Sequence, residues 1–221
     1  MNKLSITHHL TVFTTLVFLF FPNQVQSQKL NGDKTLDSRV EKYLEEHTHE
    51  FRDMNVPTKD GKLLYSLIIE GNYTKALEIG TSTGLSGIYL AWALSKTDGK
   101  LITIEIDERR HKIALKHFEQ AGLSEYVDAR LADAHTLVKS LEGPFDFVFS
   151  DADKNWYKQY FLDLDPKLVV GGCYTAHNVS DKRGGWNYNY YEFVKGLDHY
   201  NTALHPGSSL LVSYKTADKT P

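Results

Sequence analysis

The sequence contains very little cysteine. Cys173 is the single cysteine among 221 residues, which excludes an intramolecular disulfide and a metal cluster held by several cysteines. A chain of this length can bury a full hydrophobic core without such cross-links, and its length favours one domain. Because Cys173 lies in an apolar run, we expect its side chain to be buried rather than reactive.

The sequence also lacks a basic segment. The formal net charge is −3, and lysine and arginine do not gather in any long run. Proteins that bind nucleic acids usually need a basic surface that neutralises phosphates. We therefore expect a small-molecule substrate and no nucleic-acid partner.

The sequence also lacks an apolar run long enough to span a membrane. The run LTVFTTLVFLFF, residues 10–21, has 12 residues, fewer than the roughly 20 that a membrane-spanning helix needs. Lys3 precedes this run, and no acidic residue occurs before Asp33. Val25 and Ser27 then occupy the −3 and −1 positions of a cleavage site. A charged start, a short apolar centre and small residues at the exit are typical of a secretory signal.

We therefore predict that residues 1–27 are a signal peptide and that residues 28–221 form the folded domain. The chain would then be exported to the periplasm or secreted, with no stable membrane span after cleavage. The alternative is an uncleaved N-terminal anchor, which would leave the domain attached to a membrane.

Helical and strand patterns alternate along the rest of the chain. Apolar periodicity predicts helices at residues 36–51, 60–71, 85–96, 108–122, 134–143, 154–164 and 190–200. Short apolar runs predict strands at residues 75–80, 100–107, 127–133, 144–151, 167–178 and 208–215. This alternation predicts a doubly wound, mainly parallel α/β sheet with helices on both faces. Ligands of such sheets bind at the carboxyl ends of the strands, near the switch in strand order.

A glycine turn and two acids mark the end of the first predicted strand. Gly80 and Gly84 permit a sharp strand-to-helix turn, but their spacing differs from the dinucleotide pattern G-x-G-x-x-G. An NAD-dependent oxidoreductase is therefore disfavoured. Glu78 precedes the turn, and Glu105 ends the next strand, where an acid can accept both hydroxyls of a ribose. The alternative for Glu105 is a solvated charge.

These features favour a nucleoside-type cofactor without phosphates. No second glycine-rich phosphate loop and no P-loop lysine follow in the sequence. S-adenosylmethionine carries a ribose and an adenine but no phosphate, so it fits better than a dinucleotide. Ala132, Asp133 and Ala134 end the third predicted strand, where they would flank the adenine.

A second group of polar residues follows two further strands. Asp151, Asp153 and Lys154 end the apolar strand 144–151 or follow it, and His177 and Asn178 end strand 167–178. Carboxylate, amide and imidazole groups are suitable ligands for a divalent cation. The alternative is an exposed turn in which an aspartate, Asp153 above all, caps a helix.

Residues 54–178 resemble the cation-dependent O-methyltransferases, which include caffeoyl-CoA and catechol O-methyltransferases. The matching stretches are MNVPTKDGKLLYSLI, ALEIGTSTGLSGIYLAWAL, GKLITIEID, HFEQAGL and FVFSDADKNWYKQYF. The resemblance implies a Rossmann-like methyltransferase fold with a seven-stranded sheet. It also implies an S-adenosylmethionine-dependent O-methyltransferase with a small acceptor that carries a catechol-like or phenolic hydroxyl.

The resemblance assigns roles to individual positions. It implies cofactor contacts for Val56, Glu78, Gly80, Thr81, Ser86, Glu105, Ala134 and Asp153. Lys154 matches the general base, and Asp151 matches a catalytic metal ligand. Asn178 matches a second metal ligand, and Tyr160 matches a contact to the acceptor.

One position departs from the family pattern. The family usually has Asp-Asn where this chain has His177-Asn178, and both family residues hold the metal. An imidazole removes one negative charge, so we predict a weak divalent site, formed by Asp151, His177 and Asn178, that prefers manganese or zinc to magnesium. The alternative is that metal binding is lost and His177 only packs or forms hydrogen bonds.

The segment 183–193 is rich in aromatic residues. Trp186, Tyr188, Tyr190 and Tyr191 could stack on an aromatic acceptor. The alternative is that Tyr190 and Tyr191 open a helix that packs on the core, with the rest a surface loop.

Export raises a second functional hypothesis. S-adenosylmethionine is made in the cytosol and should be scarce outside it. The alternative to the enzyme is therefore an exported, non-catalytic binding protein on a methyltransferase fold. We also expect the chain to form a homodimer.

Overall fold

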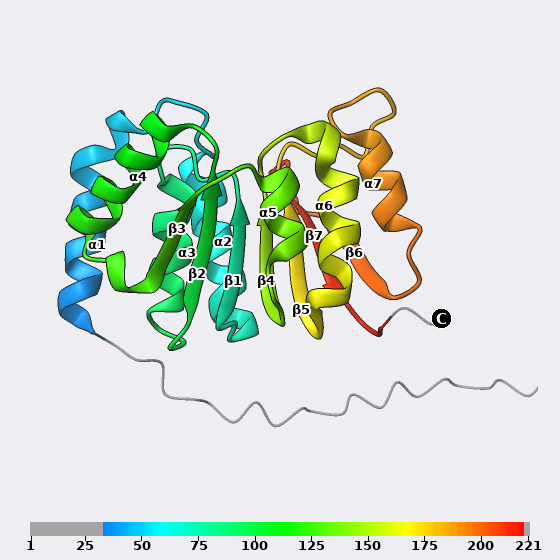
Figure 1. The fold of residues 1–221 in the computed structure, drawn as a ribbon, viewed down its shortest axis with the longest axis horizontal. Coiled ribbons are helices and arrows are strands. Elements are labelled where there is room, and N and C mark those ends of the chain that lie inside the picture. Colours follow the sequence, from blue (N-terminus) through cyan, green and yellow to red (C-terminus); the bar gives the residue numbers. More distant parts are fainter. Residues whose placement is uncertain (1–32, 219–221) are drawn as a thin grey trace, which may run out of the picture.

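Seven strands form one sheet in the computed structural model, which describes residues 33–218 (Figure 1). The strands are β1 (Lys75–Ile79), β2 (Lys100–Glu105), β3 (Val127–Leu131), β4 (Phe145–Ser150), β5 (Leu168–Ala176), β6 (Tyr200–Leu204) and β7 (Leu211–Lys215). Their order is β3-β2-β1-β4-β5-β7-β6, and β7 is antiparallel to both of its neighbours. The predicted doubly wound, mainly parallel sheet is confirmed. The predicted signal peptide, residues 1–27, lies outside the described residues.

The helices fill the intervals that the sequence pattern predicts. They are α1 (Lys34–His47), α2 (Thr58–Gly71), α3 (Leu85–Leu94), α4 (Glu108–Ala121), α5 (Ala134–Ser140), α6 (Tyr157–Leu164) and α7 (Tyr188–Lys195). Short 3₁₀ turns cover η1 (Thr48–Glu50), η2 (Ser124–Tyr126), η3 (Lys154–Trp156) and η4 (Asp165–Lys167). Among the described residues, no helix is both long enough and apolar enough to cross a membrane.

Local capping explains where several helices begin and end. The carboxylates of Asp33, Asp107 and Asp133 accept backbone N–H groups in the first turns of α1, α4 and α5. Asn72 and Gly122 take the left-handed conformation after α2 and α4, so they stop these helices.

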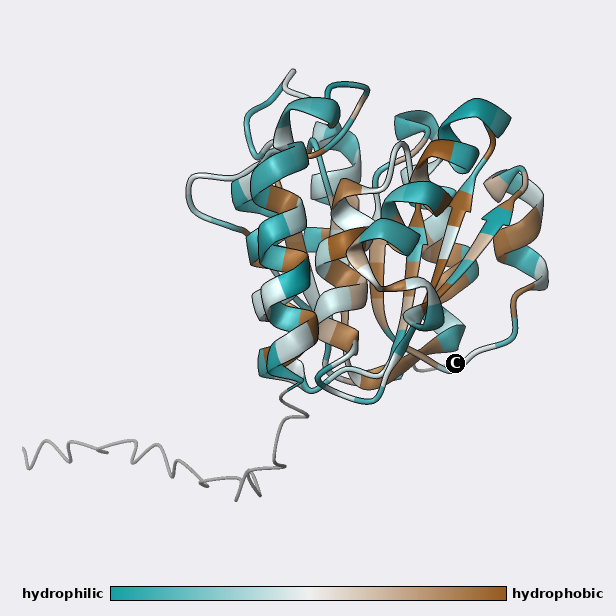
Figure 2. Cartoon of the chain, turned by 90° about the vertical axis from the view of Figure 1, so that its left-hand side faces the viewer, coloured by the Kyte–Doolittle hydropathy of each residue, from teal (hydrophilic) through white to brown (hydrophobic). Residues whose placement is uncertain are grey.

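Helices cover both faces of the sheet. α5, α6 and α7 pack on one face, and α2 and α3 pack on the other with α4 beside them, while α1 lies outside α3 and α4 (Figure 1). A hydrophobic core lies on each face of the sheet, and strand β4 contributes to both because its successive side chains point to opposite faces. Val148 packs with α5 and α6, and Phe147 and Phe149 pack with α2 and α3. Figure 2 shows apolar residues on the inward sides of the helices and polar residues outside. Cys173 is buried in the second core, as predicted.

One predicted element is wrong in its extent. The helix predicted at 190–200 ends at Lys195, and Tyr200–Leu204 form the edge strand β6. Gly196 follows the helix, and it interrupts the apolar pattern. In β6, Tyr200 and Thr202 are buried while their neighbours are exposed, a period of two over only five residues. A pattern this short, directly after a predicted helix, does not identify a strand.

Candidate functional site

The register of the sheet brings the predicted site residues together. Ile79 at the end of β1 pairs with Ile104 of β2 and with Ser150 of β4. Ser150 in turn pairs with Ala176 of β5. The residues that follow these strands therefore leave the sheet side by side, at the switch point between β1 and β4.

A cavity of about 710 Å³ lies at these strand ends, within the range of pockets that hold small ligands. Its wall is formed by residues from six segments, namely Met54, Asn55, Gly80, Ser82, Ile104, Glu105, Ile106, Arg110, Ala132, Asp133, Ala134, His135, Asp151, Ala152, Asp153, Lys154, Tyr160, His177, Asn178 and Trp186. One cavity thus joins the glycine turn after β1 to the charged residues after β4 and β5.

The turn after β1 requires glycine at its first position. Gly80 has φ +99°, and a Cβ atom there would lie 2.8 Å from the carbonyl oxygen of Asp151. Gly84 has φ +100° and begins α3, and Ser82 between them also has a positive φ. The turn therefore lets the chain pass very close to the segment after β4.

Glu105 is fixed by backbone donors. Its Oε2 accepts the N–H of Ser82 at 2.7 Å, and its Oε1 accepts the N–H groups of Ile106 at 3.1 Å and Asp107 at 2.9 Å. The carboxylate therefore links the glycine turn to the end of β2 and still lines the cavity. A carboxylate has about four lone-pair directions, so one remains for a ligand hydroxyl.

Glu78 lies below the turn rather than in the cavity wall. The hydroxyl of Thr103 donates a hydrogen bond to its Oε2 at 2.5 Å. Burial raises the pKa of Glu78 to about 8, and nearby Asp151 and Glu105 add to this effect. Hydrogen bonds with Ser86 and Thr103 oppose the rise. This buried carboxyl is therefore partly or fully protonated near neutral pH.

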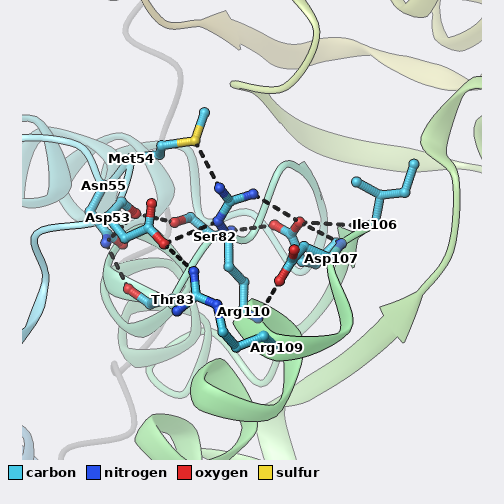
Figure 3. A network of polar contacts seen from close by, with 10 residues as sticks. Asp53, Met54, Asn55, Ser82, Thr83, Ile106, Asp107, Arg109 and Arg110 are labelled. Atoms are coloured by element: carbon cyan, nitrogen blue, oxygen red, sulfur yellow. Dashed lines mark hydrogen bonds and ion pairs between the residues drawn. The ribbon is translucent and has the colours of Figure 1, made fainter.

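The segment before α2 is tied across the cofactor end of the cavity (Figure 3). The carboxylate of Asp53 accepts hydrogen bonds from Arg109 at 2.7 Å and Arg110 at 3.3 Å. Asn55 donates to the hydroxyl of Thr83 at 2.7 Å, within the glycine turn. We call residues 53–55 the latch segment, because these contacts attach it to the start of α4 and to the turn.

An aromatic group lies beside the residues predicted to flank the adenine. The His135 ring contacts Trp156 at a centroid distance of 4.1 Å and Tyr160 at 5.9 Å. The carboxylate of Asp153 lies 3.5 Å from the same histidine and also caps η3 through the N–H of Asn155. The structure thus places Tyr160 next to His135, and its predicted role as an acceptor contact stays a prediction.

Asp151 and Lys154 form an ion pair at the other end of the cavity. The Nζ of Lys154 lies 2.5 Å from Oδ1 of Asp151, and both residues line the cavity. The N–H of Asp151 donates to the carbonyl of Ile79, which fixes this residue at the end of β1. The lysine predicted to be the base is therefore oriented by the aspartate predicted to be a ligand.

His177 lies between two carboxylates. Its Nδ1 is 3.4 Å from Oδ2 of Asp151, and its Nε2 is 3.0 Å from Oδ2 of Asp60 in α2. Burial lowers the pKa of His177, but the hydrogen bonds and charges of Asp151 and Asp60 outweigh burial, so the pKa is raised overall. In the metal-free protein these contacts therefore favour the imidazolium form.

The predicted metal ligands lie close together. Asp151, His177 and Asn178 all line the cavity, and they offer a carboxylate, an imidazole and an amide. Between residues 33 and 218, no group of three or more His, Cys, Asp or Glu side chains could hold a metal ion. Any site here would thus depend on an amide and on solvent or substrate oxygens. This set with a single carboxylate fits a weakly bound transition metal better than magnesium.

The predicted cofactor residues divide into two sets. The cavity wall includes Gly80, Glu105, Ala134 and Asp153. A second set is buried behind the wall and consists of Val56, Glu78, Thr81 and Ser86. Val56 packs with Leu64 and Leu210 in the core below α2. The direct cofactor contacts of this second set stay predictions.

The aromatic segment contributes less to the cavity than its sequence indicates. Trp186 lines the cavity and is 71% exposed. Tyr190 is buried and makes an edge contact with Tyr157, as the alternative interpretation of this segment expects. Tyr188 and Tyr191 stack on each other and are not part of the cavity wall.

The sequence analysis missed Asp60 as a site residue, although a signal was present. Asp60, Leu64, Leu67 and Ile68 fall on the buried face of α2. A charged residue on the apolar face of a helix must find a buried partner. Here that partner is His177.

The fold and the site define a Rossmann-like methyltransferase, with a glycine turn after β1 and an acid ending β2 at the switch point. Residues 24–182 match the model of the O-methyltransferase family. The chain belongs to this family, and the resemblance seen in the sequence is confirmed.

The curated relatives include catechol and caffeoyl-CoA O-methyltransferases. A catechol O-methyltransferase from Niastella koreensis is 38% identical over 130 residues, which are 57% of this chain and 58% of that protein. Caffeoyl-CoA O-methyltransferase 1 from Eucalyptus globulus is 33% identical over 136 residues, 59% of this chain and 55% of that protein. The chain thus spans a little over half the length of these relatives.

Solved structures share the fold. The O-methyltransferase from Bacillus cereus, crystallised in complex with SAH, has a TM-score of 0.65 and 24% identity, with 84% of this chain and 92% of that chain covered. TomG from Streptomyces achromogenes, in complex with SAM, also has a TM-score of 0.65 and 24% identity, with coverages of 87% and 94%. At this identity the likeness concerns the fold alone.

Proposed function

We propose that this chain is an S-adenosylmethionine-dependent O-methyltransferase that acts on a small acceptor with a catechol-like or phenolic hydroxyl. The observation that carries the proposal is the cavity that joins Glu105 to Asp151 and Lys154. Family membership and the names of the relatives, catechol and caffeoyl-CoA O-methyltransferase, support the same reaction and acceptor class.

The cofactor would occupy the end of the cavity near the glycine turn. Glu105 would accept one ribose hydroxyl through its remaining lone pair, and Ala134 with its neighbours would flank the adenine. S-adenosylmethionine supplies an electrophilic methyl group when it is bound there. The latch segment would lie beside the cofactor at this end, held by its contacts with Arg109 and Thr83.

The acceptor would lie near Asp151, Lys154 and Trp186. A phenol with a pKa of about 10 is only about one-thousandth ionised at pH 7, which costs roughly 4 kcal/mol. Once its ammonium proton has passed to solvent, Lys154 would take the hydroxyl proton as the oxygen forms its bond to the methyl carbon and the carbon–sulfur bond breaks. Asp151 orients Lys154 and stabilises the ammonium that results.

Asp151, His177 and Asn178 would hold a divalent cation, with manganese or zinc preferred to magnesium. A bound cation would stabilise the negative charge of a phenolate or catecholate. His177→Asp should shift the preference towards magnesium, because a second carboxylate restores an oxygen ligand and a negative charge. Metal affinities of both proteins, measured by calorimetry, test this shift.

An acceptor screen tests the proposed reaction. Purified protein would be incubated with labelled S-adenosylmethionine and a panel of catechols, phenols and aliphatic alcohols, with chelator and with each cation added back. Methyl transfer to catechols is the expected result. Tight binding of S-adenosylhomocysteine without transfer to any acceptor would favour the exported binding protein, and binding of NAD alone would exclude the cofactor assignment.

We further propose export through residues 1–27 and assembly as a homodimer. Mass spectrometry of the periplasmic or secreted fraction should find a chain that begins at Gln28. Intact Met1 on a cytosolic chain would contradict export. Light scattering of the purified domain should give twice the mass of one chain.

A further inference from the structure

Asp60 is a buried charge that the proposed reaction does not use directly. It lies in the first turn of α2, and 3% of its surface is exposed. Oδ2 of Asp60 lies 3.0 Å from Nε2 of His177, and Oδ1 accepts the hydroxyl of Ser208 at 2.8 Å. A buried carboxylate is costly unless each oxygen has a partner. Both oxygens have one here, and one partner is a predicted metal ligand.

The contacts around His177 fix both its backbone and its ring. Its N–H donates to the carbonyl of Ser150 at 3.0 Å, and Tyr157 donates its hydroxyl to the carbonyl of His177 at 2.9 Å. The contact with Asp60 determines which ring nitrogen faces Asp151. With Nε2 committed to Asp60, Nδ1 is left facing Oδ2 of Asp151 at 3.4 Å.

This arrangement matches a recurring feature of metal sites. A histidine that binds a metal usually donates its other ring N–H to a carboxylate, which fixes the tautomer and makes the free nitrogen a better ligand. Two ligand atoms at about 2.1 Å from a tetrahedral metal are about 3.4 Å apart. The spacing between Nδ1 of His177 and Oδ2 of Asp151 agrees with this value.

We propose that Asp60 is a positioning residue that holds His177 with Nδ1 directed to a divalent metal shared with Asp151. Asp60 does not touch the substrate or the metal, and it acts through the ring of His177. This inference rests on the proposed cation site, and it adds a residue from α2 to a site otherwise built at strand ends. It also explains how an imidazole can bind the metal at a position where the family usually has a carboxylate, because Asp60 in α2 supplies the negative charge that the imidazole lacks.

The test compares metal binding by the wild type and by Asp60→Asn, which keeps the size of the side chain but removes its charge. Zinc and manganese would be titrated into metal-free full-length protein by calorimetry, without cofactor or acceptor. We expect Asp60→Asn to bind zinc roughly 10- to 100-fold more weakly than the wild type. Ring ¹⁵N shifts of His177 should show a proton on Nε2 in the zinc-loaded wild type and a mixture of tautomers in the variant.

Asp165→Asn is a matched control. Asp165 is also a buried aspartate beside a histidine, with His199 Nε2 at 3.4 Å, but it lies near the start of β5, at the opposite end of that strand from His177. Its replacement should leave zinc affinity within about twofold of the wild type. Thermal denaturation of each variant shows that the compared proteins are folded.

The outcomes separate this inference from the proposed reaction. Equal zinc affinity of the wild type and of folded Asp60→Asn would overturn the role of Asp60. A wild type that binds neither zinc nor manganese would also overturn it, whereas methyl transfer that persists in chelator would leave the methyltransferase assignment intact. If the wild type binds zinc as expected but neither it nor the variants transfer a methyl group, the result would count against the proposed reaction alone.

Discussion

The two ends of the cavity hold their charged groups in different ways. At the cofactor end, Glu105 is held by three backbone N–H groups. At the acceptor end, Asp151 faces two side chains, the ammonium of Lys154 and the imidazole of His177. Backbone donors are set by the fold, so they hold the carboxylate of Glu105 in place, and the nearest side-chain cation, Arg110, lies 4.0 Å from Oε1. Side-chain partners can be exchanged, so the second end can change its chemistry without a change of fold.

Removal of Lys154 should have the largest effect and should affect only the acceptor end. Lys154→Met should lower kcat by about 10²- to 10⁴-fold, the usual contribution of a general base. Affinity for S-adenosylhomocysteine should stay near that of the wild type, because the lysine lies away from Glu105. Single-turnover assays and calorimetry measure the two quantities separately. An equal loss in both would mean that the two ends are not independent.

Glu78 lies beneath both ends, and its protonation should give stability a pH dependence. The pKa of Glu78 is raised to about 8 in the folded protein by burial, whereas the carboxyl ionises near its ordinary value when unfolded. The unfolded state therefore loses its proton first as the pH rises, and wild-type stability should fall by on the order of 1 kcal/mol per pH unit between about pH 5 and pH 8.

The variant Glu78→Gln has no ionisable group at this position, so its stability should fall less between about pH 5 and pH 8. Urea denaturation of both proteins at pH 5.5 and pH 7.5, without cofactor, measures the difference. Parallel changes in the two proteins would show that Glu78 ionises normally in the folded state.

Glu105→Ala should weaken S-adenosylhomocysteine binding by about 1.5–3 kcal/mol, as expected for hydrogen bonds to a charged group. The alanine variant also removes the link between Ser82 and the end of β2. In Glu105→Gln the amide NH₂ would face at least one of the backbone N–H groups that the carboxylate accepts, so this variant also disturbs the backbone contacts. Unchanged affinity in a folded alanine variant would remove Glu105 from the site.

The latch segment should give the smallest effect. Asp53→Asn removes the partner of Arg109 and Arg110, but both ion pairs are partly exposed to solvent. Affinity for S-adenosylhomocysteine should fall no more than about fivefold, and less at high salt, where such pairs are screened. Calorimetry at two salt concentrations measures this loss of affinity, with Asp163→Asn, a half-buried aspartate on α6, as the control. A loss as large as that of Glu105→Ala would show that the latch contacts the cofactor itself.

The two ends of the cavity differ in which of their contacts a local stretch of sequence records. Gly80, Gly84 and Glu105 carry a local signal, since a turn and a strand end each follow from a few adjacent residues. The contact of Asp60 with His177 joins residues 117 positions apart. The place of Asp60 on the apolar face of α2 indicates a buried partner but does not identify it as His177. The edge strand β6 was missed for another reason, because five residues at the sheet edge carry little apolar signal.

The latch segment and Asp60 belong to one short stretch of chain. Asp53 binds the arginines of α4, and seven residues later Asp60 binds His177 beyond β5. The number of residues between these two contacts therefore fixes how the cofactor end and the acceptor end of the cavity are connected. One residue inserted between Lys59 and Asp60 would turn Asp60 by about 100° around the axis of α2. Leu64, Leu67 and Ile68 hold the same face of α2 in the core, so they resist this rotation, and the contacts of Asp53 with its arginines would be lost first. The length of this stretch is therefore as much a part of the site as its side chains.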